Sequence, residues 1–477
     1  MTTTEDQVVE VGLRKNSIAV PGAMAIGIAI MAPAAGMAFL PQVIAQYVGI
    51  AVPFTYLVGT IAVLCIAYTI SVFARKFSSA GSFYTFNARG LGPGWGFMSG
   101  WLIFVGYLVF FPQNLEAFAY SFDQVLRTHG GVSIPWWLVA AVGVLVILGL
   151  AGWGIRSSMR VDLTLISLEV LVLLGLAIVI VVVGGHSGNT LAVFVPSKPV
   201  GGFAGIGFGM IFAFDTLTGF EATATVAEET RNPKRNIPRA LMGAVAGTGV
   251  FFVFISYAIT IGFGVNGGKR LASTGLPLDV LARHYLGGSY ATVVDIAVTL
   301  SAFAVALACA NGAVRVVFAM AREGVFPRRL RLGYIHPVRR TPLVAVIAVC
   351  AAALALSVGV GLAVGPYPQA YSYLGAFGAL PVIFLYGLVS VSLISYFVKT
   401  RDPEFNVIKH VVIPSVGVLV TLPVLFTSFY PLPSAPFIIV DGVLVGYTLV
   451  GVGIMVHLRR HNPEVMARVG EVMAVGD

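Results

Sequence analysis

The chain has 477 residues, of which 58% are hydrophobic and only 10% are charged, and its mean hydropathy is +0.92. This composition predicts an integral membrane protein, and the lack of short alternating apolar segments excludes a porin-like barrel. The formal net charge of +9 would suit a nucleic-acid-binding protein, but no nucleic-acid partner is expected, because the basic residues are distributed as in a membrane protein.

Long apolar runs recur from residue 19 to residue 457 and divide into about twelve helices of about twenty residues each. In chain order, the spans are predicted over residues 19–47, 50–73, 94–124, 134–151, 163–184, 203–227, 240–264, 291–320, 342–362, 370–397, 411–429 and 437–457. Residues 78–93 and 273–290 are too polar to span a membrane, but each segment is long enough for a short interfacial helix. The sequence therefore predicts an all-α integral membrane protein with twelve transmembrane helices.

Two of the predicted spans are interrupted in the middle by residues that continue a helix poorly. The interruptions are residues 31–36 (MAPAAG) in the first span and residues 216–219 (TLTG) in the sixth. Unwound backbone is tolerated at membrane depth only where it lines a cavity, so a matching pair of breaks predicts a transporter binding site. Because five spans is an odd separation, the second half enters the membrane in the opposite sense.

The breaks thus predict a five-plus-five inverted-repeat core with broken helices 1 and 6, followed by helices 11 and 12. The predicted parts are a cytoplasmic N-terminal tail (1–18), a first repeat (19–186), a second repeat (201–397), spans 11 and 12 (410–457) and a cytoplasmic C-terminal tail (458–477).

The distribution of the 29 Lys and Arg residues predicts the orientation of the chain. One, Arg315, lies inside a span, and most of the others lie on the side of the N-terminus. The residues in the opposite loops are Arg127, Lys198, Lys269, Arg270 and Arg283. By the positive-inside rule, both termini are expected to be cytoplasmic.

The three cysteines and the N-terminus add two further expectations. Cys65, Cys309 and Cys350 lie in or beside predicted spans, so we expect neither a disulfide framework nor a metal site. The N-terminus is polar and has no signal-peptide pattern, so the first helix is expected to act as its own insertion signal.

Several segments resemble the amino acid, polyamine and organocation (APC) superfamily of permeases. Residues 219–240, GFEATATVAEETRNPKRNIPRA, are similar to its sixth-span signature, with a Gly-Phe-Glu element, an acidic pair, Asn-Pro and Ile-Pro. Residues 79–84 with Gly92-Pro93 resemble the loop between its second and third spans. Residues 311–327 resemble the end of its eighth span, and residues 373–378 resemble the start of its tenth. These matches occur in the family's order along nearly the whole chain.

The resemblance implies alternating-access transport of a small amino acid or amine across a plasma membrane by a multi-pass permease that is a monomer or homodimer and not an enzyme. No cofactor is expected, and a proton gradient is the expected energy source in place of sodium, mainly because of the carboxylate of Glu169 in the predicted fifth span. In such permeases the backbone at the break of the first span holds the substrate's carboxylate, and carbonyls beside both breaks hold its ammonium. The positions that match are Ala32, Ala34, Ala35, Gly36, Phe214, Asp215, Thr216, Leu217 and Gly219. Independently, a half-helix N-terminus favours an anion and a C-terminus favours a cation.

Asp215 departs from the family pattern, because many relatives have an aromatic or small residue just before the sixth-span break. Three roles fit a carboxylate here. It could pair with a cationic side chain of an arginine-, lysine- or ornithine-like substrate or a polyamine. It could carry a proton alongside a neutral substrate, or it could hydrogen-bond neighbouring hydroxyls for structure alone.

Glu169 is the second candidate carboxylate. It follows Asp162 by seven residues, so both fall on one helical face, with Glu169 about 10 Å inside the span. In several proton-coupled relatives a lysine near this part of the fifth span takes the place of a sodium ion, and Glu169 stands near that position. Desolvation favours a protonated carboxyl group, which suits proton coupling, and a buried structural partner for Thr, Ser or Arg is the alternative.

Two more carboxylates are candidates for coupling or gating. Glu221 belongs to the Gly-Phe-Glu element, whose glutamate lies on the cytoplasmic side of the site in the family. Glu116, in the outer part of the third span, is the weaker candidate because Gln113 and Asn114 could form a polar patch with it.

Together these features predict a secondary-active permease that takes up an amino acid with protons, with a cationic amino acid or a polyamine favoured. A substrate exchanger and a proton-coupled importer of neutral amino acids remain alternatives.

Overall fold

The computed structural model describes residues 18–77, 82–153, 159–196, 202–322, 324–336, 339, 341–430 and 435–468. Regular structure within these ranges is helical, and one isolated parallel bridge joins Ile18 to Thr230. The predicted N-terminal tail therefore lies almost wholly outside the described residues, and so does the end of the predicted C-terminal tail after residue 468.

Each of the twelve predicted spans corresponds to a helix or a pair of helices. They are α1 (Val20–Met31) with α2 (Pro33–Phe39), α4 (Val52–Lys76), α6 (Pro93–Gly130), α7 (Trp136–Gly152), α8 (Met159–Val183), α9 (Gly202–Leu217) with η2 (Phe220–Glu229), α10 (Pro233–Phe263), α13 (Gly288–Arg322), α14 (Leu343–Val364), α15 (Gln369–Thr400), α16 (Ile413–Phe429) and α17 (Ala435–His461). Eleven of these spans are long and apolar enough to cross a membrane, with the α16 span counted from Ile408, and α7, an apolar helix of 17 residues, is shorter than these eleven.

Short helices occupy the segments between the spans. They are α5 (Ser82–Leu91), η1 (Ala192–Phe194), α11 (Gly268–Ser273), α12 (Pro277–Leu286) and η3 (Arg328–Leu330), and α18 (Pro463–Arg468) follows the last span. By contrast, α3 (Pro41–Val48) continues the half of the first predicted span that α2 begins, and η4 (Ile408–Val412) leads directly into α16. The short helices predicted within residues 78–93 and 273–290 are confirmed as α5 and α12, although residues 78–81 lie outside the described part of the chain.

Both predicted helix breaks are present, and they differ in construction. In the first, Ala32 adopts a left-handed conformation with φ 44° and ψ 76°, and Pro33 then begins α2. Proline has no N–H for the preceding turn, so the helix ends there and starts again in a new direction. In the second, α9 ends at Leu217 and Gly219 has φ 116°, a conformation that glycine adopts without steric cost.

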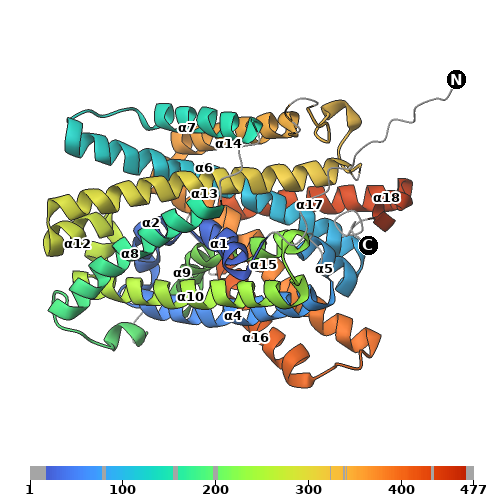
Figure 1. Ribbon diagram of the computed structural model, residues 1–477, viewed down its shortest axis with the longest axis horizontal. Helices are drawn as coiled ribbons and strands as arrows, with labels where there is room; N and C mark the ends of the chain where they lie inside the picture. The colour runs from blue at the N-terminus through green and yellow to red at the C-terminus, as the bar shows by residue number, and fades with distance from the viewer. Residues whose placement is uncertain are drawn as a thin grey trace.

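The two broken spans lie next to each other in the middle of the bundle. In Figure 1 the labels of α1, α9 and α15 lie between the long helices α13 and α6 above and α10 and α4 below. Helix α1 packs against η2, and α3 packs against α9, so each half of one broken span contacts a half of the other. The most extensive helix contacts are α4 with α10 and α6 with α13. This packing brings the two breaks together, while the boundaries of the two repeats stay a prediction.

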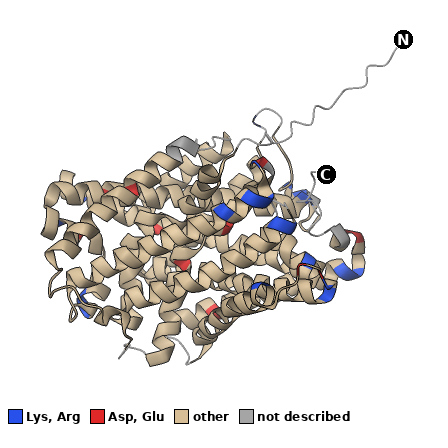
Figure 2. Cartoon of the chain, turned by 60° about the horizontal axis from the view of Figure 1, so that its bottom comes forward, with Lys and Arg blue, Asp and Glu red and all other residues tan. Residues whose placement is uncertain are grey.

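The charged residues are unevenly distributed over the bundle. Figure 2 shows that most of the Lys and Arg visible in that view lie towards the end where both termini lie. At the end of α4, Lys76 Nζ lies 2.7 Å from Asp402 Oδ2 and 2.9 Å from Glu404 Oε2. The Lys76 ammonium holds the pKa of Asp402 below its usual value. These ion pairs tie α4 to the loop that follows α15.

Candidate functional site

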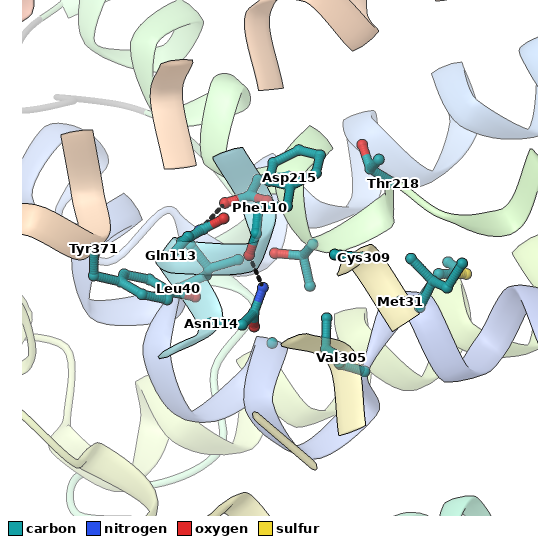
Figure 3. Close-up of a pocket in the computed structure, with 14 residues that line it drawn as sticks. Met31, Leu40, Phe110, Gln113, Asn114, Asp215, Thr218, Val305, Cys309 and Tyr371 are labelled. Carbon is teal, nitrogen blue, oxygen red and sulfur yellow. Dashed lines mark hydrogen bonds between the residues drawn. The ribbon is translucent and has the colours of Figure 1, made fainter. Parts of the chain in front are cut away.

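A small cavity lies where the two helix breaks meet. Its volume is about 30 Å³, enough for about one or two water molecules, so a larger ligand requires its walls to move apart. Figure 3 shows side chains from several helices converging on it. The lining residues are Ile30, Met31, Ala32, Gly36, Leu40, Phe110, Gln113, Asn114, Asp215, Thr216, Thr218, Val305, Cys309 and Tyr371.

Asp215 is the charged residue of this cavity. It lies in the last turn of α9, and its Oδ2 accepts a hydrogen bond of 2.7 Å from Nε2 of Gln113 on α6, drawn as a dashed line in Figure 3. Among the described residues that line the cavity, no other Asp or Glu and no Lys, Arg or His is present. The cavity therefore offers a site for a cation.

A glycine of α15 packs directly behind this hydrogen bond. A Cβ added at Gly375 would lie 2.6 Å from Gln113 Nε2 and 2.9 Å from Asp215 Oδ2. Both distances are shorter than a carbon atom and a polar nitrogen or oxygen atom tolerate without displacement. Three helices, α6, α9 and α15, thus meet at the Asp215 carboxylate. They can approach this closely because the residue at position 375 is glycine, which has no side chain.

Glu169 lies at the break of the first span but does not line the cavity. Its Oε2 accepts hydrogen bonds from Ser301 Oγ at 2.9 Å and from the backbone N–H of Ala34 at 3.4 Å. The N–H of Ala35 donates to Ser301 Oγ at 3.3 Å. Glu169 of α8 therefore connects the first turn of α2 to α13. Two of the amides predicted to hold a substrate carboxylate are bonded by these side chains in this conformation.

Glu221 connects the second break to its surroundings in a similar way. Its Oε2 accepts hydrogen bonds of 3.0 Å from the N–H of Gly219 and from Tyr386 Oη on α15, and its Oε1 accepts one of 3.2 Å from Tyr107 Oη on α6. The carboxylate is buried, and three donors surround it. Each helix break therefore has a buried carboxylate that accepts a hydrogen bond from one backbone N–H at the break and from side chains on neighbouring helices.

Glu116 is buried away from the cavity lining. Its Oε1 accepts a hydrogen bond of 2.6 Å from Ser357 Oγ on α14, and its Oε2 is buried without a hydrogen-bond partner among the described residues. The sequence suggests that Glu116, Gln113 and Asn114 could form one polar patch. In the structure Gln113 and Asn114 line the cavity and Glu116 does not, so the three side chains do not form a single patch.

The other candidate residues divide into cavity-lining and packing positions. Ala32, Gly36 and Thr216 line the cavity, whereas Phe214 and Leu217 are fully buried and do not. The structure also adds lining residues that were not among the sequence candidates: Ile30, Met31, Leu40, Phe110, Gln113, Asn114, Thr218, Val305, Cys309 and Tyr371. Gln113 and Asn114 could have been found as two consecutive amides within an apolar span.

In the described ranges, no three His, Cys, Asp or Glu side chains come together as a group that could hold a metal ion. Cys65, Cys309 and Cys350 are free thiols. The polar groups that line the cavity are the Asp215 carboxylate, two amides, three hydroxyls and the Cys309 thiol.

Comparisons of the sequence with known proteins identify related transporters. Among curated relatives, the low-affinity putrescine importer PlaP of Escherichia coli (strain K12) is 29% identical over 306 residues, which cover 63% of this chain and 65% of the relative. The branched-chain amino acid permease BcaP of Bacillus subtilis (strain 168) is 28% identical over 308 residues, covering 61% and 63%. The methylthioribose transporter of the same organism is 23% identical over 316 residues, covering 63% and 66%.

The chain thus spans slightly less than two thirds of the length of each of these relatives. Their names describe transporters and not enzymes. The amino acid permease family matches residues 22–464, nearly the whole chain, in agreement with the apolar helices of a multi-pass membrane protein. The resemblance found in the sequence is confirmed: the chain belongs to the amino acid permease family, within the APC superfamily.

Proposed function

We propose that this protein is a secondary-active permease that takes up a small amine-bearing substrate, with a cationic amino acid or a polyamine favoured, by proton-coupled alternating access. The observation that carries the proposal is Asp215, a carboxylate at the cavity between two broken helices. An intramembrane carboxylate is costly unless it meets a partner, and a substrate ammonium is such a partner. The putrescine importer among the relatives supports the same substrate class.

The size of the cavity supports a transport cycle with moving walls. Since about 30 Å³ holds only one or two water molecules, a substrate enters when one side of the bundle opens and leaves when the other side opens. The walls come from both broken spans and from α6, α13 and α15, so opening requires these elements to separate. Alternating access accounts for a site that is contracted in one state and open in others.

Glu169 has the position of a proton-coupling residue in this cycle. An ionised carboxylate is a stronger acceptor than a protonated one for the Ser301 hydroxyl and the Ala34 amide. Protonation therefore weakens the connection of α2 to α8 and α13 and lets this half of the first broken span move. Glu221 has the same relation to the second break, where we propose a gating role.

The proposed location is the plasma membrane, with both termini on the cytoplasmic side. Its support is the excess of Lys and Arg on the side of the N-terminus. We propose no cofactor, and the proton gradient is the proposed energy source in place of sodium. The proposed partners are the small-molecule substrate and the lipid bilayer, with a monomer or homodimer as the assembly.

Uptake into proteoliposomes tests the proposal. Labelled arginine, lysine, ornithine, putrescine and neutral amino acids are each supplied with and without an inward proton gradient. Saturable uptake of cationic substrates that the gradient drives is the expected result. Uptake only when the vesicles contain substrate would favour the exchanger. Gradient-driven uptake of neutral amino acids alone would favour the neutral importer, and no uptake of any compound would refute transport of this class.

The variant Asp215→Asn separates the roles of the carboxylate within the same assay. Asparagine keeps the size of the side chain but carries no charge, so cationic substrates should lose affinity relative to neutral ones. Unaltered selectivity would remove Asp215 from the substrate's contacts. Loss of gradient dependence with unaltered selectivity would indicate that Asp215 carries the proton instead.

A further inference from the structure

The nitrogen and the oxygen of the Gln113 side-chain amide differ in their hydrogen bonding. Its Nε2 donates to Asp215 Oδ2 at 2.7 Å, while its Oε1 is buried and has no hydrogen-bond partner among the described residues. Gln113 lines the cavity and is only 2% exposed. A buried carbonyl oxygen without a donor is unfavourable, and in this conformation no described side chain donates to Gln113 Oε1, so the atom is open to an N–H group of a ligand.

The neighbouring carboxylate determines which end of the amide meets it. An ionised carboxylate can only accept hydrogen bonds, so Gln113 must direct its NH₂ group towards Asp215 and its carbonyl oxygen elsewhere. Each residue of the pair therefore has one acceptor oxygen that does not take part in this hydrogen bond. These atoms are Gln113 Oε1 and the second carboxylate oxygen of Asp215. Both side chains lie close to Gly375 of α15, where an added Cβ would come within 2.9 Å of each.

Most other polar side chains of the cavity already donate to the protein itself. Asn114 Nδ2 donates to the carbonyl of Phe110 at 2.8 Å. The hydroxyls of Thr216 and Thr218 donate to backbone carbonyls one turn earlier in α9, at 2.9 Å and 2.8 Å. The Tyr371 hydroxyl, which interacts with the Gln113 side chain, can donate or accept. The polar surface offered to a ligand is therefore rich in acceptors.

We propose that Gln113 is a specificity-determining residue, and that its Oε1 and the free oxygen of Asp215 together accept two N–H groups from one substrate ammonium. This inference rests on the proposed function and refines its substrate class. A primary ammonium has three N–H groups and satisfies both oxygens. A tertiary ammonium has one and a quaternary ammonium has none, so each leaves at least one buried acceptor unpaired. A secondary ammonium has two N–H groups and also satisfies both oxygens. The site therefore selects compounds whose ammonium, whether an α-ammonium or a terminal one, keeps at least two N–H groups, over tertiary and quaternary ammonium compounds.

The expected size of the effect follows from the hydrogen bond to a charged group. Loss of one such bond weakens binding about ten- to a hundredfold. Gln113→Met keeps the length of the side chain and removes both its carbonyl oxygen and the NH₂ group that donates to Asp215. The second loss acts on every competitor, whereas the first acts only on those that donate to the carbonyl oxygen. Primary amines should therefore lose about ten- to a hundredfold in affinity, while the trimethylated compounds, which make no bond to this oxygen, should change little.

The test measures inhibition constants against labelled putrescine or labelled lysine, whichever the wild-type protein takes up into proteoliposomes. The competitors are putrescine with its tetramethyl and hexamethyl derivatives, and alanine with its N,N-dimethyl and N,N,N-trimethyl derivatives. The decisive quantity is the ratio of the constants for the primary and the fully methylated compound, compared between variants, because methyl groups also add bulk in every variant. Gln46→Met, at an exposed position on α3, is the matched control and should keep the wild-type ratio.

Collapse of this ratio in Gln113→Met supports the inference, and an unchanged ratio in a folded, active Gln113→Met overturns it. If thermal unfolding shows that Gln113→Met does not fold, Gln113→Glu decides, since it retains an acceptor towards the cavity. Gln113→Glu should keep or increase the preference for the primary ammonium, and a lost preference would overturn the inference. Absence of uptake of any amine by the wild-type protein would refute the proposed function itself, which is a separate outcome.

Discussion

Glu169→Gln tests the proposed coupling role with the least disturbance of the structure. Glutamine has the same length as glutamate, and its carbonyl oxygen can still accept hydrogen bonds from Ser301 Oγ and the Ala34 amide. What the variant loses is the ability to be ionised and to take up a proton. We therefore expect proton-driven accumulation to be abolished, while exchange of substrate across the membrane continues.

The two hydrogen bonds of Glu169 set the cost of the substitution. A bond to a charged group contributes about 1.5–3 kcal/mol and a neutral bond about 0.5–1.5 kcal/mol. Since the bond to Ala34 is long at 3.4 Å, the net loss in Glu169→Gln should be about 1–2 kcal/mol. Glu169→Ala leaves both donors unpaired in a buried position and should cost about 2–6 kcal/mol. The first variant should therefore remain folded, and the second serves as the comparison for lost structure.

Two measurements in proteoliposomes separate coupling from stability. Accumulation is followed with an inward proton gradient at a series of external pH values, and exchange is followed without a gradient and with substrate inside the vesicles. Thermal unfolding in detergent reports the change in stability. If Glu169→Gln retains the pH dependence of wild-type uptake, Glu169 does not carry the coupled proton, and its contacts are structural.

Three further substitutions test the construction of the two breaks. Gly219→Ala places a Cβ 2.7 Å from the Ile30 side chain at φ 116°, so we expect lower thermal stability and no uptake, and normal uptake would show that the break tolerates another conformation. Tyr386→Phe removes one of three donors to Glu221 and should lower the free energy of unfolding by about 1.5–3 kcal/mol, which an unchanged unfolding midpoint would contradict. Ala32→Gly relieves a left-handed alanine and should raise stability by about 1 kcal/mol, and a lower midpoint would show that the alanine side chain is needed.

The helices and their breaks could be predicted from sequence because each has a local cause. Apolar runs of the length of a bilayer predict spans, and Pro33 and Gly219 interrupt a helix wherever they occur. The predicted ends differ from the observed ones by a few residues, because polar first turns such as Pro233 to Arg239 extend a helix beyond its apolar part. Such extensions depend on packing and capping outside the membrane core.

The site was predicted less completely, because its contacts join residues far apart in the chain. Asp215 and Glu169 attract attention as isolated carboxylates in apolar spans. The sequence does not contain the information that Gln113 bonds Asp215, or that Ser301 and Glu169 take the amides of the first break, since both contacts depend on how helices pack. Phe214 was a plausible candidate from its place beside the break, yet it packs within the protein, with its ring 6.2 Å from that of Tyr386.

The meeting of three helices at Asp215 bears on how this site could be redesigned. Replacing Asp215 alone with a residue that accepts no hydrogen bond would leave Gln113 Nε2 without its acceptor. It would also remove one of the two side chains for which position 375 has to be glycine. Apart from substitutions of similar size and shape such as Asp215→Asn and Gln113→Met, single substitutions should therefore give mostly inactive proteins, whereas a combinatorial library at positions 113, 215 and 375 would sample the compensated combinations. New substrates should arise in such a library as sets of linked substitutions on α6, α9 and α15.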